Sequence, residues 1–588
     1  MKKVVLAAAL LVCVASLFHF CKSDNKSASL TGNKTYIRLS NEPERLNPLT
    51  TEESNAVQVM SYMFPTLLDF DPQTLELIPV LAKSRPIVAT IDTGKLKGGT
   101  SYTYEIRDEA TWDNGAPVTA ADFVFTLKAI LNPKSGANNL KSGLDFIKNI
   151  VIDAANPKKF TILSDKKYFL AESKTGTMPI LPEYAYDTER SLKAFSVADL
   201  ASIDTAKIAP ALVQFANNLQ SPKFSREKAG IVGCGAYAFE EWKTGERIVL
   251  KKKANWWGDK LASQSPFFMA LPDELHFRPV KDEAAAMSLL KDGQFDAMVK
   301  LSPKDFLEMS KNDTFKTIYN FSTAPSYSLA HIGFNCKSPK LDDKRTRKAI
   351  AQLVDVQAII TKLMRGLAEP CVGPFVPQRA YYNKDLKAID MNIEQAKTLL
   401  AAAGWKNTNG DSTLDKSIGG KTTELTLRFA FGSNNGIAKN IGLMLQENAA
   451  KAGVKIELVP VEPTAFLGVM KKRDFDLFVN NVGFSAELDD PKEMWASSSN
   501  TPDGGNRFQF ENKAADALIT QIRSELDVAK RNELYKKFEA LIYEEQPAVF
   551  LFTAKERLAL NKRFEATVTT NPRRLYWLGE FKLVKIKD

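Results

Sequence analysis

Hydrophobic and polar positions follow a helix-and-strand pattern in the second half of the chain. Leu425 to Phe431 alternates apolar and polar residues, as a half-buried strand does. Ile437 to Leu445 places its apolar residues on one helical face, and Val454 to Leu458 resumes the alternation after Gly453. A helix between two such strands predicts a right-handed crossover between parallel strands. We therefore expect residues 281–553 to form one α/β domain.

Capping signals place the starts of two further helices. Thr119 followed three residues later by Asp122 resembles a capping box, which predicts a helix through the apolar stretch Phe123 to Ile130. Asp282 can cap a second helix that runs to Lys291. This second helix is expected to open the α/β domain.

The first half of the chain has a less regular pattern. Tyr36 to Leu39 predicts a strand that ends in a polar loop containing prolines, and Tyr102 to Arg107 predicts a half-buried strand. Trp112 to Gly115 follows as a turn with Asn-Gly at its tip. Because Pro and Gly interrupt residues 34–280 throughout, we expect an α+β body with long connections there.

The N-terminus carries the pattern of an export signal. Lys2 and Lys3 precede an uncharged run from Val4 to Phe20. A charged start followed by an apolar stretch of this length predicts a signal peptide over residues 1–20. The chain is therefore expected to be exported.

Cys21 ends the apolar run, and a polar stretch follows it. This resembles a bacterial lipoprotein signal, whose cysteine is lipidated and becomes the mature N-terminus, and residues 21–33 would then form a tether. The alternative is cleavage at the small residues Ser27-Ala28-Ser29, which would give a soluble exported protein. Both interpretations place the body outside the cytoplasm, in the periplasm or at the cell surface.

The scarcity of histidine narrows the possible chemistry. The 588 residues include three histidines, His19, His276 and His331, of which the first lies inside the predicted signal peptide. The other two lie in apolar alternating stretches, where a structural histidine is more common than a catalytic one. A hydrolytic triad needs an imidazole between nucleophile and carboxylate. We expect no catalytic residue, no metal site, no cofactor and no enzymatic activity.

Charge and cysteine content refine this picture. The formal net charge is +10, without a dense block of Lys and Arg interleaved with aromatic residues. Such a mild excess of positive charge is typical of soluble proteins, and no nucleic-acid partner is expected. Cys234, Cys336 and Cys371 would remain in the mature chain besides Cys21. One disulfide is possible, but no spacing selects a pair.

Several short motifs follow one another along the chain. In order they are Leu46-Asn47-Pro48, Ile78 to Ala82, Trp112 to Phe125, Gly233 to Tyr237 with Trp242, Asn255 to Gly258, Phe334-Asn335 with Asp342, Arg345, Arg347 to Ile350 and Asp355, Glu487 to Pro491, and Gln546 to Leu551. This series, from about residue 36 to 560, resembles family 5 of the bacterial extracellular solute-binding proteins, the peptide- and nickel-binding receptors of ABC importers.

The resemblance implies a two-lobed periplasmic-binding-protein fold, α/β and α+β in class, with a third domain inserted into the first lobe. The implied boundaries are 34–61 with 201–280 and 554–588 for the first lobe, 62–200 for the inserted domain and 281–553 for the second lobe. Crossovers near residues 280 and 553 would form the hinge on which the lobes close.

The resemblance also implies where a ligand would bind. An extended peptide can be held by main-chain hydrogen bonds to an exposed strand edge, with pockets for alternate side chains. Val482 to Glu487 is the candidate edge in the second lobe, with Gly483 permitting close approach of the backbone, and Phe484 a candidate pocket wall or a core residue. The remaining candidate ligand-binding residues are Ser485 and Ala486 in the same edge and Ser40, Asn41 and Glu42 in the first lobe.

Glu487 stands where peptide-binding members of the family have an Asp that pairs with the α-ammonium of the ligand. The other interpretation is a solvated acid beside Asp489 and Asp490. Trp112, Trp242 and the aromatic residues of the other motifs are expected to be structural.

The function implied by the resemblance is capture of short peptides and their delivery to an ABC permease. The partners would be the peptide, the permease and, through the N-terminal lipid, a membrane, and a monomer is expected. The alternatives are a non-peptide solute such as an oligosaccharide or a metal complex or, from another class, an exported hydrolase.

Overall fold

A computed structural model of the chain describes residues 30, 32–204, 207–571 and 574–584. The predicted signal peptide, the predicted lipidation site Cys21 and most of the predicted tether lie outside the described residues. Within the described ranges, every helix is too short or too polar to cross a membrane.

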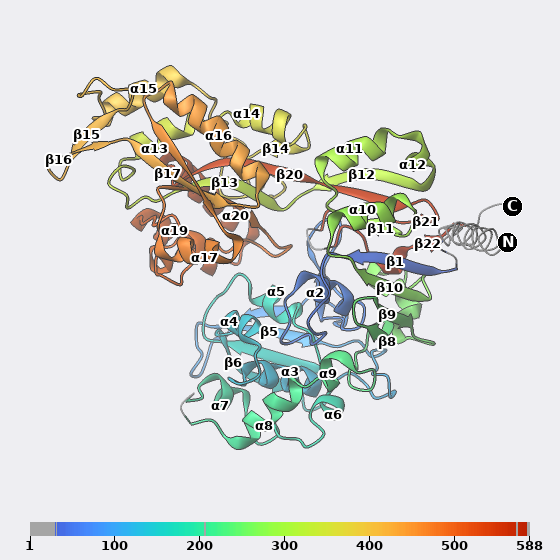
Figure 1. Ribbon diagram of the computed structural model, residues 1–588. Helices are drawn as coiled ribbons and strands as arrows, with labels where there is room; N and C mark the ends of the chain where they lie inside the picture. The colour runs from blue at the N-terminus through green and yellow to red at the C-terminus, as the bar shows by residue number, and fades with distance from the viewer. Residues whose placement is uncertain (1–29, 31, 205–206, 572–573, 585–588) are drawn as a thin grey trace, which may run out of the picture.

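One twelve-stranded sheet passes through most of the molecule (Figure 1). Its strands in spatial order are β18 (Lys455–Val461), β17 (Thr426–Gly432), β19 (Leu477–Gly483), β13 (Ser328–Phe334), β20 (Ala548–Asn561), β11 (Ala297–Met298), β1 (Lys34–Leu39), β10 (Glu274–Pro279), β9 (Arg247–Lys252) and β8 (Tyr237–Lys243). β12 (Tyr319–Pro325) and β14 (Ala368–Pro370) also pair with β20. We call the part with β1, β8 to β12 and the second half of β20 the first lobe, and the part with β13 to β19 the second lobe.

β20 is the strand that the two lobes share. Its first half pairs with β13, from Gly333 opposite Ala548 to Ala330 opposite Phe552, and its second half pairs with β12 and β11. The predicted crossover near residue 553 falls within this strand. Thr553 Oγ1 donates a 2.8 Å hydrogen bond to the carbonyl of Ser326, in the connection from β12 to β13. The two chain crossings between the lobes are therefore bonded to each other.

With the sheet divided in this way, residues 281–325 fall in the first lobe, whereas the sequence predicts them in the second. They form α10 (Glu283–Lys291), β11, α11 (Pro303–Lys311), α12 (Asp313–Ile318) and β12. Leu290, Met309 and Tyr319 pack in one apolar cluster with Ala559 of β20. We therefore propose that the first crossover lies at Ser326-Tyr327 and not near residue 280.

The second lobe contains the predicted parallel unit. β17 and β18 are parallel along their whole length, and α16 (Gly436–Ala450) connects them. Gly453 has a positive φ of 75° after this helix, as a left-handed C-terminal position requires. The other helices of this lobe are α13 (Lys344–Ala351), α14 (Val356–Ala358), α15 (Ile393–Ala402), α17 (Pro463–Lys472), α18 (Lys492–Trp495), α19 (Lys513–Ser524) and α20 (Val528–Glu545).

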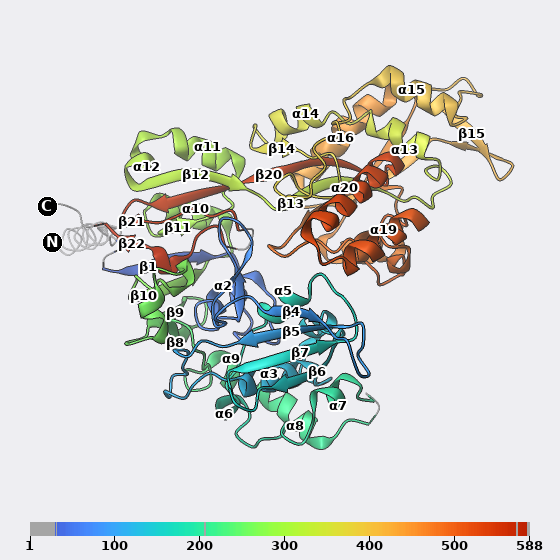
Figure 2. The same ribbon diagram turned by 180° about the vertical axis from the view of Figure 1, so that it is seen from behind.

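A separate four-stranded sheet lies below the large one, and Figure 2 shows it from behind. Its strands are β4 (Ile87–Thr90), β5 (Thr100–Glu105), β7 (Lys159–Ser164) and β6 (Ile147–Ile152). Its helices are α3 (Ala120–Leu131), α4 (Asn138–Ser142), α5 (Ala171–Gly176), α6 (Glu183–Tyr186), α7 (Val197–Ala201), α8 (Pro210–Leu219) and α9 (Lys223–Arg226). We call this unit the inserted part. α8 packs on α3, with 6.0 Å between the rings of Phe125 and Phe215, although the sequence placed α8 in the first lobe.

Shorter elements complete the fold. They are α2 (Ser54–Met60), β2 (Leu68–Phe70), β3 (Leu77–Pro79), β15 (Asp415–Ile418), β16 (Lys421–Glu424), β21 (Phe564–Glu565) and β22 (Lys582–Leu583).

The capping prediction at α3 is confirmed. Asp122 accepts a 2.9 Å hydrogen bond from the backbone N–H of Thr119. The same carboxylate also accepts from Trp112 Nε1 at 3.3 Å, and Trp112 is buried. Trp112 therefore has a structural role.

Gly233 and Gly235 allow a close approach between backbones. The N–H of Gly235 donates to the carbonyl of Met63 at 2.9 Å. A Cβ on Gly235 would lie 2.4 Å from the carbonyl oxygen of Tyr62, where real Cβ contacts essentially never fall. The carbonyl of Cys234, between the two glycines, accepts from the indoles of Trp256 and Trp257 at 2.8 Å each.

This approach leads to a prediction for Gly235→Ala. The variant is expected to lower the free energy of unfolding by about 1–3 kcal/mol or more, because backbone atoms cannot move aside as a side chain can. Gly468→Ala, in the exposed middle of α17 with open space around its Cβ, is the matched control, expected to raise stability by about 0.5–1 kcal/mol. Urea unfolding measures both variants, and shifts of the same sign would contradict the prediction.

Candidate functional site

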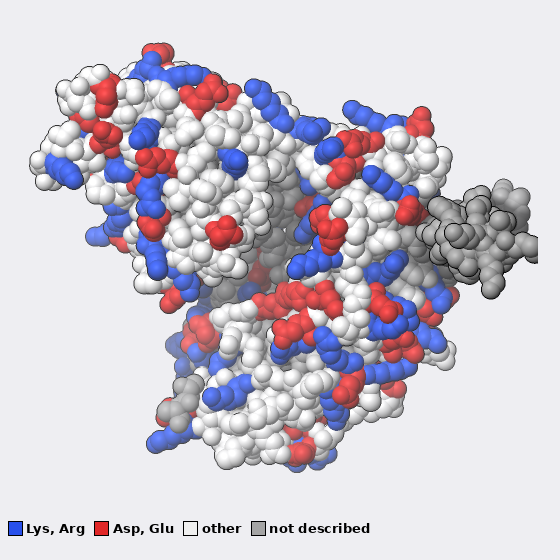
Figure 3. Space-filling view, viewed as in Figure 1, with Lys and Arg blue, Asp and Glu red and all other residues white. Residues whose placement is uncertain are grey.

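The molecular surface is hollowed where the second lobe faces the rest of the molecule (Figure 3). The residues that the sequence proposed for ligand binding lie in two separate segments. One segment continues from β19 in the second lobe, and the other follows β1 in the first lobe.

The end of β19 has an unpaired edge. β19 pairs with β13 along its whole length, but it pairs with β17 only at Leu477 and Phe478. Beyond Phe478, none of the described strands pairs with that second side. Asn480, Asn481 and Gly483 are exposed there. Backbone groups of this edge are therefore available to an extended chain from outside.

A buried arginine donates hydrogen bonds to the backbone of the loop that follows β19. Arg379 donates to the carbonyls of Ser485 and Glu487 at 2.8 Å each. It also forms an ion pair with Asp489, with 2.6 Å between Nη2 and Oδ1, and only 5% and 8% of the two side chains are exposed. We call residues 484–489 the platform loop. The carbonyls of this loop are held by a network of charge-assisted hydrogen bonds.

Two tyrosines complete this network. The hydroxyl of Tyr381 donates to Asp489 Oδ2 at 2.7 Å, and the hydroxyl of Tyr535 donates to the carbonyl of Asp489. The two rings are stacked with their centroids 4.0 Å apart. The platform loop therefore rests on the core of the second lobe.

Glu487 is paired with the inserted part. Its Oε2 lies 2.7 Å from Lys174 Nζ, and its Oε1 accepts a hydrogen bond from Ser173 Oγ, both residues of α5. Only 17% of the Glu487 side chain is exposed. In this structure Glu487 is therefore a paired and mostly covered acid.

The other candidates of the platform loop are largely covered. Ala486 is buried, and Phe484 is half-buried against the main apolar core. The N–H of Phe484 donates to the carbonyl of Tyr327 at 2.7 Å, which extends the pairing of β19 with β13. Gly483 is exposed at the start of the loop and Ser485 is half-buried.

The first-lobe candidates bind neighbours in their own part of the molecule. Asn55 Nδ2 donates to the carbonyl of Asn41 at 2.7 Å and to Ser40 Oγ at 3.3 Å. Glu42 accepts from Trp242 Nε1 at 2.6 Å, so its carboxylate is engaged. Among the described residues, no hydrogen bond or ion pair joins Ser40, Asn41 or Glu42 to the platform loop.

Sequence reasoning did not identify Arg379, Tyr381, Ser173 or Lys174. Arg379 lies 110 positions before its partner Asp489, and Lys174 lies 313 positions before Glu487. Neither residue belongs to a short motif. Their contacts are produced by the packing of distant segments, which no local pattern reveals.

Both histidines lie in strands, as the sequence predicted. His331 in β13 is buried, its Nε2 has no partner, and burial lowers its pKa to about 4. His276 in β10 contacts Glu274 at 2.7 Å, and burial lowers its pKa as well. Neither imidazole bonds to a hydroxyl or thiol among the described residues, so neither is part of a hydrolytic triad there.

The cysteines of the body are free thiols. Cys234, Cys336 and Cys371 form no disulfide in the described part of the chain. Burial raises the pKa of Cys234 and Cys371 to about 12 and that of Cys336 to about 11, so all three are protonated at neutral pH. Within the described ranges, no three residues of the types His, Cys, Asp and Glu gather as a metal site would require.

Comparison with known proteins identifies a family and relatives that match most of the chain. The family description "Bacterial extracellular solute-binding proteins, family 5 Middle" matches residues 76–505. The oligopeptide-binding protein AppA of Bacillus subtilis is 26% identical over 576 residues, which cover 96% of this chain and 95% of that protein.

Solved structures share the fold. The structure of AppA from Bacillus subtilis in complex with a nonapeptide has a TM-score of 0.66 at 23% identity, covering 94% of this chain and 99% of that one. NikZ from Campylobacter jejuni in complex with Ni(L-His) has a TM-score of 0.68 at 23% identity, covering 94% and 100% of the two chains. The architecture is therefore that of two-lobed solute-binding proteins.

Proposed function

This chain belongs to family 5 of the bacterial extracellular solute-binding proteins, and from this premise we propose that it captures short peptides between its lobes and delivers them to an ABC permease. The observation that carries the proposal is the unpaired edge of β19, continued by the rigid platform loop. The chain's similarity to an oligopeptide-binding protein over almost its whole length supports the same ligand class.

The edge of β19 suits an extended peptide. Main-chain groups of the ligand would pair with the free side of residues 479–483, and alternate side chains would point away from the strand. Because backbone pairing is independent of side-chain identity, this mode accepts many sequences. The fixed platform loop reduces the entropy that binding must overcome.

Closure of the lobes would complete the site. Ser326 and Thr553 lie at the two crossings between the lobes, where a few residues can absorb the change in backbone angles. On closure, we propose, Ser40, Asn41 and Glu42 approach the ligand from the first lobe. No chemical step is needed, because the receptor only binds, closes and releases.

Location follows from the same proposal. Members of this family are extracytoplasmic binding proteins. We propose that residues 1–20 are removed on export, that lipid on Cys21 tethers the protein to a membrane, and that the mature protein is monomeric.

Cys21→Ser is expected to abolish incorporation of a labelled fatty acid, measured on cells expressing the full chain. Equal labelling of the variant and the wild type would contradict the lipid anchor.

Peptide binding is tested on the purified protein. Mass spectrometry of small molecules released by denaturation should detect short peptides, and calorimetry with a diverse library of short peptides should give saturable binding. A folded protein that binds no member of the library would refute the proposal. Release of an oligosaccharide or a nickel complex instead would favour the non-peptide alternative.

A further inference from the structure

Two residues of the inserted part reach across to the platform loop of the second lobe. Lys174 Nζ lies 2.7 Å from Glu487 Oε2, and Ser173 Oγ donates to Glu487 Oε1. Each oxygen of the carboxylate thus has a donor from α5. The carboxylate is 17% exposed and the lysine side chain 34% exposed.

Both donors are held in place by their own surroundings. Ser173 is buried, and its hydroxyl also lies 3.0 Å from the carbonyl of Leu170. The stem of Lys174 passes over Gly143, where a Cβ would lie 2.9 Å from Lys174 Cδ. A larger residue at position 143 would push this stem away. Each donor of the bridge thus has a further contact within the inserted part.

Neighbouring contacts connect the same two surfaces. The N–H of Phe169 donates to the carbonyl of Arg523 at 3.1 Å. Arg523 pairs with Asp490 at 2.9 Å and lies over the ring of Tyr168, 5.4 Å from its centroid. Residues 168–174 thus contact Arg523 of α19 as well as Glu487, and Arg523 in turn pairs with Asp490 beside the platform loop.

The bridge has a consequence for the ligand. An unpaired carboxylate at a peptide site would attract the α-ammonium, which is the cation that every unblocked peptide carries. At Glu487 an ammonium group is already present, because Lys174 supplies it. A ligand amine would have to displace Lys174 and break a charge-assisted pair to form an equivalent one, so the exchange brings little net gain.

We propose that Lys174 is a specificity-determining residue that supplies the cation at Glu487 and thereby removes selection for a free ligand amine. This inference rests on the proposed peptide-binding function. The receptor holds peptides by backbone pairing to β19, and it accepts N-terminally blocked peptides as well as free ones.

The test uses matched pairs of peptides from the library, each in a free and an N-acetylated form. Their dissociation constants are measured by calorimetry on the wild type, Lys174→Met and Lys166→Met. Lys166 is the control because it also lies in the inserted part and forms an ion pair, 2.6 Å from Asp145, away from Glu487.

For the wild type and Lys166→Met, the two forms of each peptide are expected to bind within about threefold of each other, since no charge-assisted bond distinguishes them. Lys174→Met frees the carboxylate, so the free form should then bind about tenfold tighter or more. Glu487→Gln in the Lys174→Met background should remove this preference, which keeps the test independent of any one variant.

The outcomes separate the two proposals. A wild type that favours free peptides by about tenfold or more would overturn the role of Lys174 while leaving peptide binding intact. An unchanged ratio of dissociation constants in Lys174→Met would do the same. A wild type that binds neither form of any peptide would overturn the proposed function, and the inference with it.

Discussion

Replacing Arg379 with Met is expected to lower the free energy of unfolding by about 3–5 kcal/mol, because Asp489 would be left as a buried, unpaired carboxylate. The carbonyls of Ser485 and Glu487 would lose a donor at the same time. A platform loop without this support should no longer present a fixed surface, so peptide affinity should fall as well. Stability is measured by urea unfolding, and binding by calorimetry below the unfolding transition.

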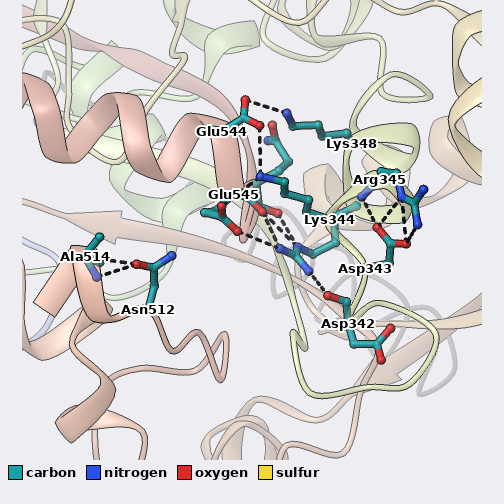
Figure 4. Close-up of polar contacts among 12 residues, drawn as sticks. Asp342, Asp343, Lys344, Arg345, Lys348, Asn512, Ala514, Glu544 and Glu545 are labelled. Carbon is teal, nitrogen blue, oxygen red and sulfur yellow. Dashed lines mark hydrogen bonds and ion pairs between the residues drawn. The ribbon is translucent and has the colours of Figure 1, made fainter. Parts of the chain in front are cut away.

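The matched control is Arg345→Met. Arg345 pairs with Asp343 through Nη2 at 2.6 Å and Nε at 3.0 Å, as Figure 4 shows, but its side chain is 52% exposed. Water screens such a pair and solvates the partner that remains, so little change in stability is expected. Equal losses in the two variants would show that burial of the Arg379 pair has no special effect.

Replacing Glu539 with Gln is expected to abolish the loss of stability that this one carboxyl causes as the pH rises from about 4.5 to 8. Glu539 on α20 is fully buried, Oε2 accepts from the N–H of Asn383 at 2.6 Å, and Oε1 has no partner. Burial raises the pKa of Glu539 from 4.5 to about 8. Asn383 follows Arg379 and Tyr381 in the chain, so the Glu539 carboxyl bonds to the same segment that supports the platform loop.

The direction of the pH effect on stability follows from proton binding to Glu539. Between pH 4.5 and 8 the folded protein keeps the proton on Glu539, whereas the unfolded chain has lost it. The contribution of Glu539 to stability therefore falls as pH rises through this window, by at most about 1.4 kcal/mol per pH unit, and levels off above it. His331 and His276, whose pKa values are lowered by burial, contribute with the opposite sign below about pH 6.5. Gln is neutral at every pH, so the variant should gain several kcal/mol relative to the wild type at the alkaline end.

Urea unfolding at a series of pH values measures this effect. Glu533→Gln, on the exposed side of the same helix and paired with Lys536 at 2.8 Å, is the control and should keep the wild-type slope. If the profile of Glu539→Gln ran parallel to that of the wild type, the proposed burial of a neutral carboxyl would be wrong.

The sequence predicts the regular elements well where local pattern and packing agree. β17, α16 and β18 are found as predicted, because one buried face imposes the strand period and the helix period in turn. Lys344 and Lys348 of α13 form ion pairs with Glu544 of α20 (Figure 4). These two helices lie far apart in the sequence, so no local pattern predicts that they contact each other.

The boundaries and the site were harder to predict. Helices and strands alternate on both sides of Ser326, so periodicity alone does not indicate the change of lobe that we propose there. The resemblance implied the region of the platform loop as a ligand site and left two roles open for Glu487, a partner of the ligand amine or a solvated acid. Its actual partner, Lys174, depends on how the inserted part meets the second lobe, which is a property of tertiary packing.

The continuity of β20 limits how the molecule can move. A single strand with hydrogen-bonded neighbours in both lobes cannot slide, because sliding would break the pairing along its whole length. Rotation near Thr553 and Ser326 would instead leave the pairing of β20 with β13 and with β12 in place, since these pairs lie on either side of the crossing. Relative motion of the two lobes is therefore expected to be a rotation about these crossings and not a translation of one lobe past the other.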